Sequence, residues 1–194
     1  MGITQKFFQI LVIAGLSLAT GAAVTKSGNA APNPAGAADE QAIYETVLRS
    51  WLDGSHDAQM VNQRLGAPPS ASENAECAKG VRFSKAAVDA PTDKTLDPAT
   101  FHQRNIVLVD GDKWAADDPE RSMAQGKSVD DAVKQAFSHS LISFSQVAFS
   151  EDGKDALVSF RMTCGMLCGH GFTLWMHKSN GHWNRAGECG SYVN

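Results

Sequence analysis

Apolar residues recur at helical spacing near the beginning of the chain. Residues 39–53 carry one continuous apolar face, which predicts an amphipathic helix. We expect Asp39 to be the N-cap and Gly54 to end the helix. The positions on that face are Ile43, Tyr44, Val47, Leu48, Trp51 and Leu52.

A second helical pattern lies in residues 128–139. Ser128 and Asp131 form a capping box at its start. The apolar positions then follow at i, i+3, i+4, i+7 and i+8: Val129, Ala132, Val133, Ala136 and Phe137. This spacing predicts a helix that packs Val133 and Phe137 into the core.

The last fifty residues show the alternation of β-strands. Residues 146–149 and 156–163 flank Asp152-Gly153, a dipeptide typical of a two-residue hairpin turn. Counting back from this turn pairs Phe149 with Ala156 and Val147 with Val158.

Asn180-Gly181 predicts a second hairpin. A regular register pairs Met176 with Arg185, Leu174 with Gly187 and Phe172 with Cys189. Cys189 would then share a face with Phe172, Leu174 and Met176, whereas one extra residue would turn it to the other face.

The middle of the chain carries weaker signals. Short strands are predicted at residues 81–83 and 106–109, a helix from Asp97 to about residue 104, and polar loops at 68–73 and 115–127. Together the elements predict an α+β fold, with N-terminal and middle helices packed on a C-terminal antiparallel β-meander.

The N-terminus has the three parts of an export signal. A short positive segment precedes the apolar stretch 7–19, and small residues follow it. We therefore expect a signal peptide over 1–30, a flexible linker over 31–38 and a single α+β domain over 39–194. The protein would be periplasmic or secreted, and would contact a membrane only through an uncleaved leader.

The charge balance narrows the partners. The chain has 17 Lys and Arg against 21 Asp and Glu, a net charge of −4. A protein that binds nucleic acid without sequence preference needs clustered positive charge, so this balance excludes that class. No cofactor is indicated.

Four cysteines in an exported chain predict two structural disulfides. Cys164 and Cys168 lie in a glycine-rich stretch that permits a tight local bridge. Cys77 would then pair with Cys189.

Other chemistries compete for this loop. Cys164, Cys168, His170 and His182 are residue types that bind zinc, and the Cys-x3-Cys spacing is in the usual range. A thioredoxin-like centre would need Cys-x-x-Cys beside a helix. Hydrolase signatures such as Gly-x-Ser-x-Gly are absent from the sequence, and no catalytic residue is assigned.

The C-terminal segment resembles a group of uncharacterised exported bacterial proteins with the ending SxVxF…ALV…CGxLCGxG…GxW. The matching stretches are 145–149, 156–158, 164–171 and 181–183. The chain departs from that pattern at 189–192, where the group more often has a tryptophan. The resemblance implies export and an α+β fold, and it implies no catalytic residue.

Two functions remain open at this point. The first is a non-enzymatic exported binding module, acting as an inhibitor, immunity factor or adaptor toward an envelope protein. The second is an envelope enzyme or zinc-binding protein that uses the Cys164–Cys168 loop and its nearby histidines.

We expect cleavage of the leader between Ala22 and Ala31, because its apolar core is short and is diluted by small residues. Intact-mass measurement of the exported protein tests this. A mass that retains residues 7–19 would contradict it.

Overall fold

The computed structural model describes residues 34–52, 58–84, 93–98, 105–115, 119–165 and 168–193. The expected leader, Gly54 and most of the helix expected from Asp97 lie outside these residues. The elements are α1 (Pro34–Trp51), β1 (Gln59–Asn62), β2 (Ile106–Val109), α2 (Pro119–Ala124), α3 (Val129–Ser138), β3 (Leu141–Phe144), β4 (Ala148–Phe149), β5 (Asp155–Gly165), β6 (Cys168–Ser179) and β7 (His182–Val193).

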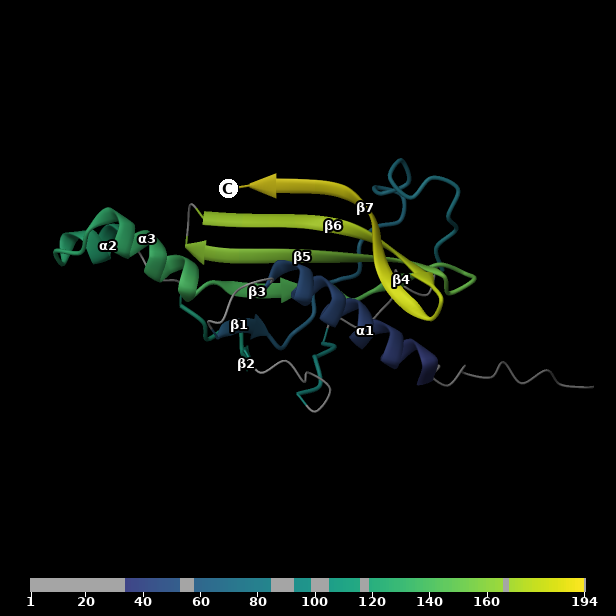
Figure 1. The fold of residues 1–194 in the computed structure, drawn as a ribbon, viewed down its shortest axis with the longest axis horizontal. Coiled ribbons are helices and arrows are strands. Elements are labelled where there is room, and N and C mark those ends of the chain that lie inside the picture. Colours follow the sequence, from purple (N-terminus) through teal and green to yellow (C-terminus); the bar gives the residue numbers. More distant parts are fainter. Residues whose placement is uncertain are drawn as a thin grey trace, which may run out of the picture. The chain divides into compact units, whose positions relative to one another are not determined.

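A seven-stranded sheet forms the centre of the fold, in the order β2-β1-β3-β5-β6-β7, with β4 also paired to β5 (Figure 1). The pairs among β3, β4, β5, β6 and β7 are antiparallel, as expected for a meander. β1 pairs in parallel with both β2 and β3. The α+β class is therefore confirmed, and the predicted strand 106–109 is β2. The strands β1 and β3 were not predicted.

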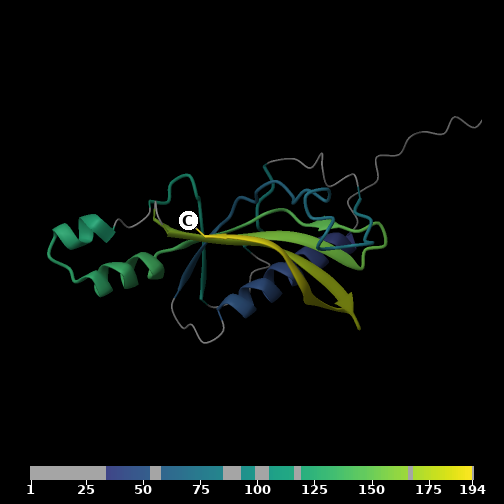
Figure 2. The ribbon, with the colours of Figure 1, turned by 90° about the horizontal axis from the view of Figure 1, so that it is seen from above.

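The helix α1 covers one face of the sheet (Figure 2). Ile43, Val47 and Leu48 are almost fully buried against β5 and β6, and Trp51 packs at the edge of the same core. The Tyr44 hydroxyl donates to the carbonyl oxygen of Ser145 at 3.0 Å, and burial raises the pKa of that hydroxyl. The apolar face predicted from the sequence is confirmed.

The helix begins earlier than expected, so the linker prediction is wrong for residues 34–38. Proline fits the first turn of a helix because its missing N–H is not needed there, and Ala37 and Ala38 favour helix. Asp39 is consequently inside α1 and is not its N-cap. Its carboxylate accepts hydrogen bonds from Lys178 Nζ at 2.6 Å and Trp183 Nε1 at 3.0 Å.

Both hairpin turns form. Phe149 pairs with Ala156 as expected, although β4 begins only at Ala148 and Val147 lies outside it. Gly153 has a φ of 69°, and the backbone N–H of Ser150 donates to the carbonyl oxygen of Asp155. At the second turn Asn180 and Gly181 have φ values of 51° and 79°, as a two-residue turn requires.

The register of β6 and β7 differs from the prediction beyond Arg185. Met176 pairs with Arg185, but Trp175 pairs with Gly187 and Thr173 with Gly190. A bulge at each of these two steps inserts one residue into β7, and a one-residue shift turns side chains to the opposite face. Cys189 therefore packs with Trp175 and Leu157, and not with Phe172, Leu174 and Met176.

The helix α3 does not bury Val133 and Phe137 in the core as predicted. α3 begins at its expected cap, with the Asp131 backbone N–H donating to Ser128 Oγ at 3.1 Å. Ala132 and Ala136 are its buried residues, whereas Val133 and Phe137 are 42% and 49% exposed. Figure 1 shows α3 and α2 beyond the end of β5.

Two smaller expectations also fail. The stretch 115–127 contains α2 and is not only a loop. Residues 81–83 form no strand, and only Phe83 makes an isolated bridge, with Ser150. Among the described residues, no helix has the length and apolar character needed to cross a membrane.

Phe137→Ala should lower the free energy of unfolding by less than about 1 kcal/mol, because its ring is half exposed. Phe160→Ala is the matched comparison. Phe160 is 1% exposed, so its loss should cost about 3 to 5 kcal/mol. Urea unfolding of both variants tests the assignment, and equal losses would contradict it.

The Asp39 contacts predict a dependence of stability on pH. Burial alone would raise the pKa of Asp39, but the hydrogen bonds from Lys178 and Trp183 hold it below its ordinary value. A carboxyl group whose pKa is lower in the folded protein than its value of about 4 in the unfolded chain stabilises the fold at any pH above about 4. This stabilisation is lost as the pH falls through the pKa of the folded protein. Asp39→Asn should lose about 1 kcal/mol at pH 7.

Urea unfolding at pH 7 and at pH 3 measures this effect. The difference in free energy of unfolding between the wild type and Asp39→Asn should be smaller at pH 3 than at pH 7. Asp93→Asn is the control, because Asp93 is exposed, lies outside the helices and makes no ion pair within the described part of the chain. A gap that stays constant would contradict the assignment.

Candidate functional site

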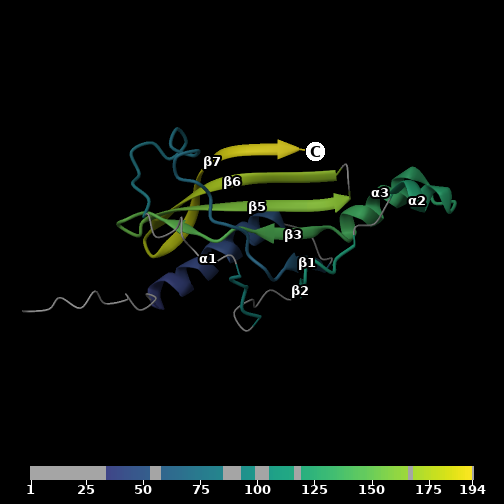
Figure 3. The same cartoon turned by 180° about the vertical axis from the view of Figure 1, so that it is seen from behind.

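Within the described part of the chain, the face of the sheet opposite α1 is covered over only part of its length. The segment 77–84 lies over the end of the sheet where β5 begins and β6 ends, as seen from behind in Figure 3. Ala78, Val81 and Phe83 pack there on Leu157 and Trp175. The Cys77–Cys189 disulfide, with a Cα–Cα distance of 4.9 Å, fixes this segment to β7.

The rest of that face carries polar side chains. We call it the open half, and define it by Ser143, Ser159, Arg161, Thr173, Gly190 and Tyr192. It follows directly from strand alternation: Val158, Phe160 and Met162 of β5 enter the core on the α1 side. Ser159 and Arg161 therefore point the other way.

Two rows of residues cross the open half. In the first row, Ser159 pairs with Thr173, which pairs with Gly190. The hydroxyls of Ser159 and Thr173 are hydrogen-bonded at 2.8 Å. The neighbouring row contains Ser143, Arg161, Gly171 and Tyr192, each from a different strand.

Gly171 allows the contact at the centre of the second row. A β-carbon there would lie 2.3 Å from Cε1 of Tyr192, so only glycine leaves room for the ring. The ring extends across β6 to β5, where Arg161 Nε donates to the Tyr192 hydroxyl. The guanidinium carbon lies 5.3 Å from the ring centroid, a cation–π distance.

Two hollows of about 340 and 300 Å³ lie on the open half and share Ser159, Phe160 and Arg161. The described residues of their lining include two arginines and no aspartate or glutamate. Arg64, at the edge of one hollow, is ion-paired with Asp112 at 2.7 Å. Arg161 makes no ion pair within the described part of the chain. The open half therefore carries one uncompensated positive charge.

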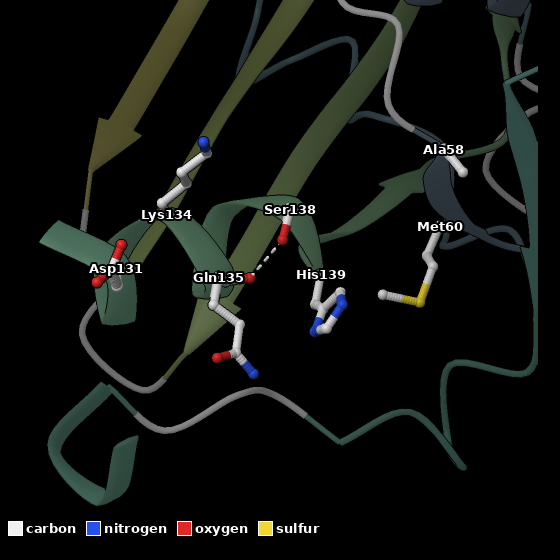
Figure 4. A pocket seen from close by; sticks show the side chains of 7 residues that line it. All are labelled: Ala58, Met60, Asp131, Lys134, Gln135, Ser138 and His139. Atoms are coloured by element: carbon white, nitrogen blue, oxygen red, sulfur yellow. Dashed lines mark hydrogen bonds between the residues drawn. The ribbon is translucent and has the colours of Figure 1, made fainter. Parts of the chain in front are cut away.

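A larger hollow, of about 580 Å³, lies between α3 and the start of β1 (Figure 4). Met60 and His139 border it, and the Ser138 hydroxyl beside them donates to the Gln135 carbonyl. Its one carboxylate, Asp131, accepts a hydrogen bond from the hydroxyl of the capping residue Ser128. The larger hollow contains no cluster of groups with a shared chemical task.

An acid–imidazole pair lies where β5 begins and β6 ends. Asp155 Oδ1 lies 2.8 Å from His177 Nδ1 and accepts a hydrogen bond from Trp175 Nε1, also at 2.8 Å. A hydrolytic triad would also need a hydroxyl or thiol at the second ring nitrogen. Among the described residues, nothing bonds to that nitrogen of His177.

The four residues considered as an alternative zinc site are not brought together. Cys164 is joined to Cys168, as the structural prediction required. His170 stacks on Trp51, with ring centroids 5.9 Å apart, and His182 lies beside the Asn180-Gly181 turn at the other end of β6. Within the described residues, no three histidine, cysteine, aspartate or glutamate side chains could share a metal ion.

The open half was not predicted from the sequence. The available signal was the alternation in β5, where Leu157 is followed on the same face by Ser159 and Arg161. It was not sufficient, because the position of Tyr192 beside Arg161 depends on the two bulges in β7.

Replacing Cys77 and Cys189 together by alanine should lower the free energy of unfolding by about 5 kcal/mol, because their disulfide closes a long loop. The same change at Cys164 and Cys168, four positions apart, should cost about 2 kcal/mol. Urea unfolding measures both, and peptide mapping without reductant should recover the two links. A peptide joining Cys77 to Cys164 or Cys168 would contradict the pairing.

No protein family, curated protein or solved structure matches the chain.

Proposed function

We propose that the protein is exported to the periplasm or secreted, and that it acts there as a non-enzymatic binding module. It would serve as an inhibitor, an immunity factor or an adaptor, with an envelope protein as its partner. Three observations support export: the leader pattern, the resemblance of the C-terminal segment to exported bacterial proteins, and two disulfides of the kind common outside the cytoplasm.

The observation that carries the binding proposal is the contrast between the two parts of one sheet face. Around Leu157 and Trp175 the face is apolar, and the bridged segment covers it. In the open half the side chains change to hydroxyls and arginine, and two adjoining hollows are left. A concave surface that carries a few hydrogen-bonding groups on rigid strands is suited to holding a partner in one orientation.

The alternative, an enzyme or zinc protein built on the Cys164–Cys168 loop, has less support. Both sulfurs are bonded to each other, so neither is a thiolate for metal or redox chemistry in this state. His170 is packed between aromatic rings, on Trp51 and beside Phe172.

Photo-crosslinking in the cells that export the protein tests the proposal. Gly190 is the position for p-benzoylphenylalanine, because a β-carbon built there meets no atom within 4 Å. Glu151, exposed in the turn before β5, is the control position. We expect one discrete protein adduct from position 190 and none from position 151. The same result at both positions, or no adduct from position 190, would overturn the proposal.

A further inference from the structure

We propose that the open half binds a carboxylate in an extended peptide segment of the partner, and that Arg161 is the anchor. This inference rests on the proposed function, since it names the chemistry that the same surface recognises. Three features of the site carry it: the charge of the surface, the orientation of the guanidinium and the neutral floor around it.

The charge of the open half is opposite to that of the chain as a whole. The chain has a net charge of −4, yet among the described residues no carboxylate lines either hollow. Arg64 is neutralised by Asp112, which leaves Arg161 as the unpaired charge between the hollows. An anion bound here would meet one positive group and no lining acid that repels it.

The guanidinium of Arg161 is held in a fixed orientation. Its Nε donates to Tyr192, whose ring is seated over Gly171. The two terminal nitrogens make no other hydrogen bond within the described residues. A carboxylate can accept from both terminal nitrogens at once, and the bidentate pair is stronger than a bond to a single point charge.

The floor around Arg161 favours a peptide as the bearer of the carboxylate. Ser143 lies directly across from Arg161, and its hydroxyl makes no hydrogen bond within the described part of the chain. With the Ser159–Thr173 pair it offers neutral donors and acceptors on both sides of the charge. Such groups suit the N–H and C=O groups of an extended chain that leaves one hollow and enters the other.

A membrane surface fits the open half less well. Recognition of anionic lipid requires several lysines or arginines close together. The hollows offer one uncompensated arginine. A single carboxylate matches this charge.

A random peptide library displayed on phage, selected on the mature disulfide-bonded protein, provides the probe. We expect the selected peptides to share one Asp or Glu at a fixed position. Arg161→Gln should weaken binding of a synthetic selected peptide by about tenfold to a hundredfold, the range for a charge-assisted hydrogen-bond pair. Arg82→Gln, an exposed arginine near the turn before β5, is the matched control and should leave binding unchanged.

Gly190→Trp separates the two proposals, because its side chain would project over the hollow without a clash at Cβ. If Gly190→Trp abolishes the binding of selected peptides that share no Asp or Glu, the carboxylate inference is overturned, whereas the proposed binding surface is supported. Selected peptides that bind Gly190→Trp as well as the wild type would overturn the proposed function. Binding of the wild type to phosphatidylglycerol vesicles that depends on Arg161 would assign the site to lipid and also overturn the inference.

Discussion

The burial of one face of β5 and β6 beneath α1 determines what every other surface of the molecule can do. Val158, Phe160 and Leu174 are nearly inaccessible under the helix, and rings from α1, β3 and β5 contact one another there. Because side chains of a strand alternate, this single contact assigns each remaining residue of β5 and β6 to the opposite face. The polar residues that alternate with the core residues of β5 and β6 therefore lie on the face opposite α1.

The disulfide between Cys77 and Cys189 then divides that opposite face. It connects a segment that has no regular strand to the edge strand β7, and brings Ala78 and Phe83 onto Leu157. Among the described residues, the cover ends where the apolar residues of the face end. The boundary between Leu157 and Ser159 is thus both a change in chemistry and a change in exposure.

Local features of the fold could be predicted from the sequence, and features that depend on distant segments could not. The face of α1, the cap at Ser128 and the Asn180-Gly181 turn are each set by residues within a few positions. The parallel strands β1 and β2 are 44 or more residues apart along the chain, in a stretch with little periodicity. No local pattern specifies such a pairing.

The errors have equally specific causes. An amphipathic pattern shows that Phe137 and Val133 share a side of α3, but not that a core lies beneath that side. The face of Cys189 was predicted from a regular register, and the bulge after Arg185 reverses it. The disulfide partners were correct nevertheless, because Cys77 lies on the face to which Cys189 turns.

The contact between Asp39 and Lys178 also fixes the end of the sheet at which α1 begins. It places the start of α1 beside the tip of the β6–β7 hairpin, whereas Tyr192 lies at the far end of β7 (Figure 1). An attachment made ahead of α1 therefore starts at the end of the sheet remote from Arg161. One added after Asn194 starts two residues beyond Tyr192, which lines one of the two hollows. Immobilising the protein through its N-terminal side is the orientation that leaves the arginine accessible.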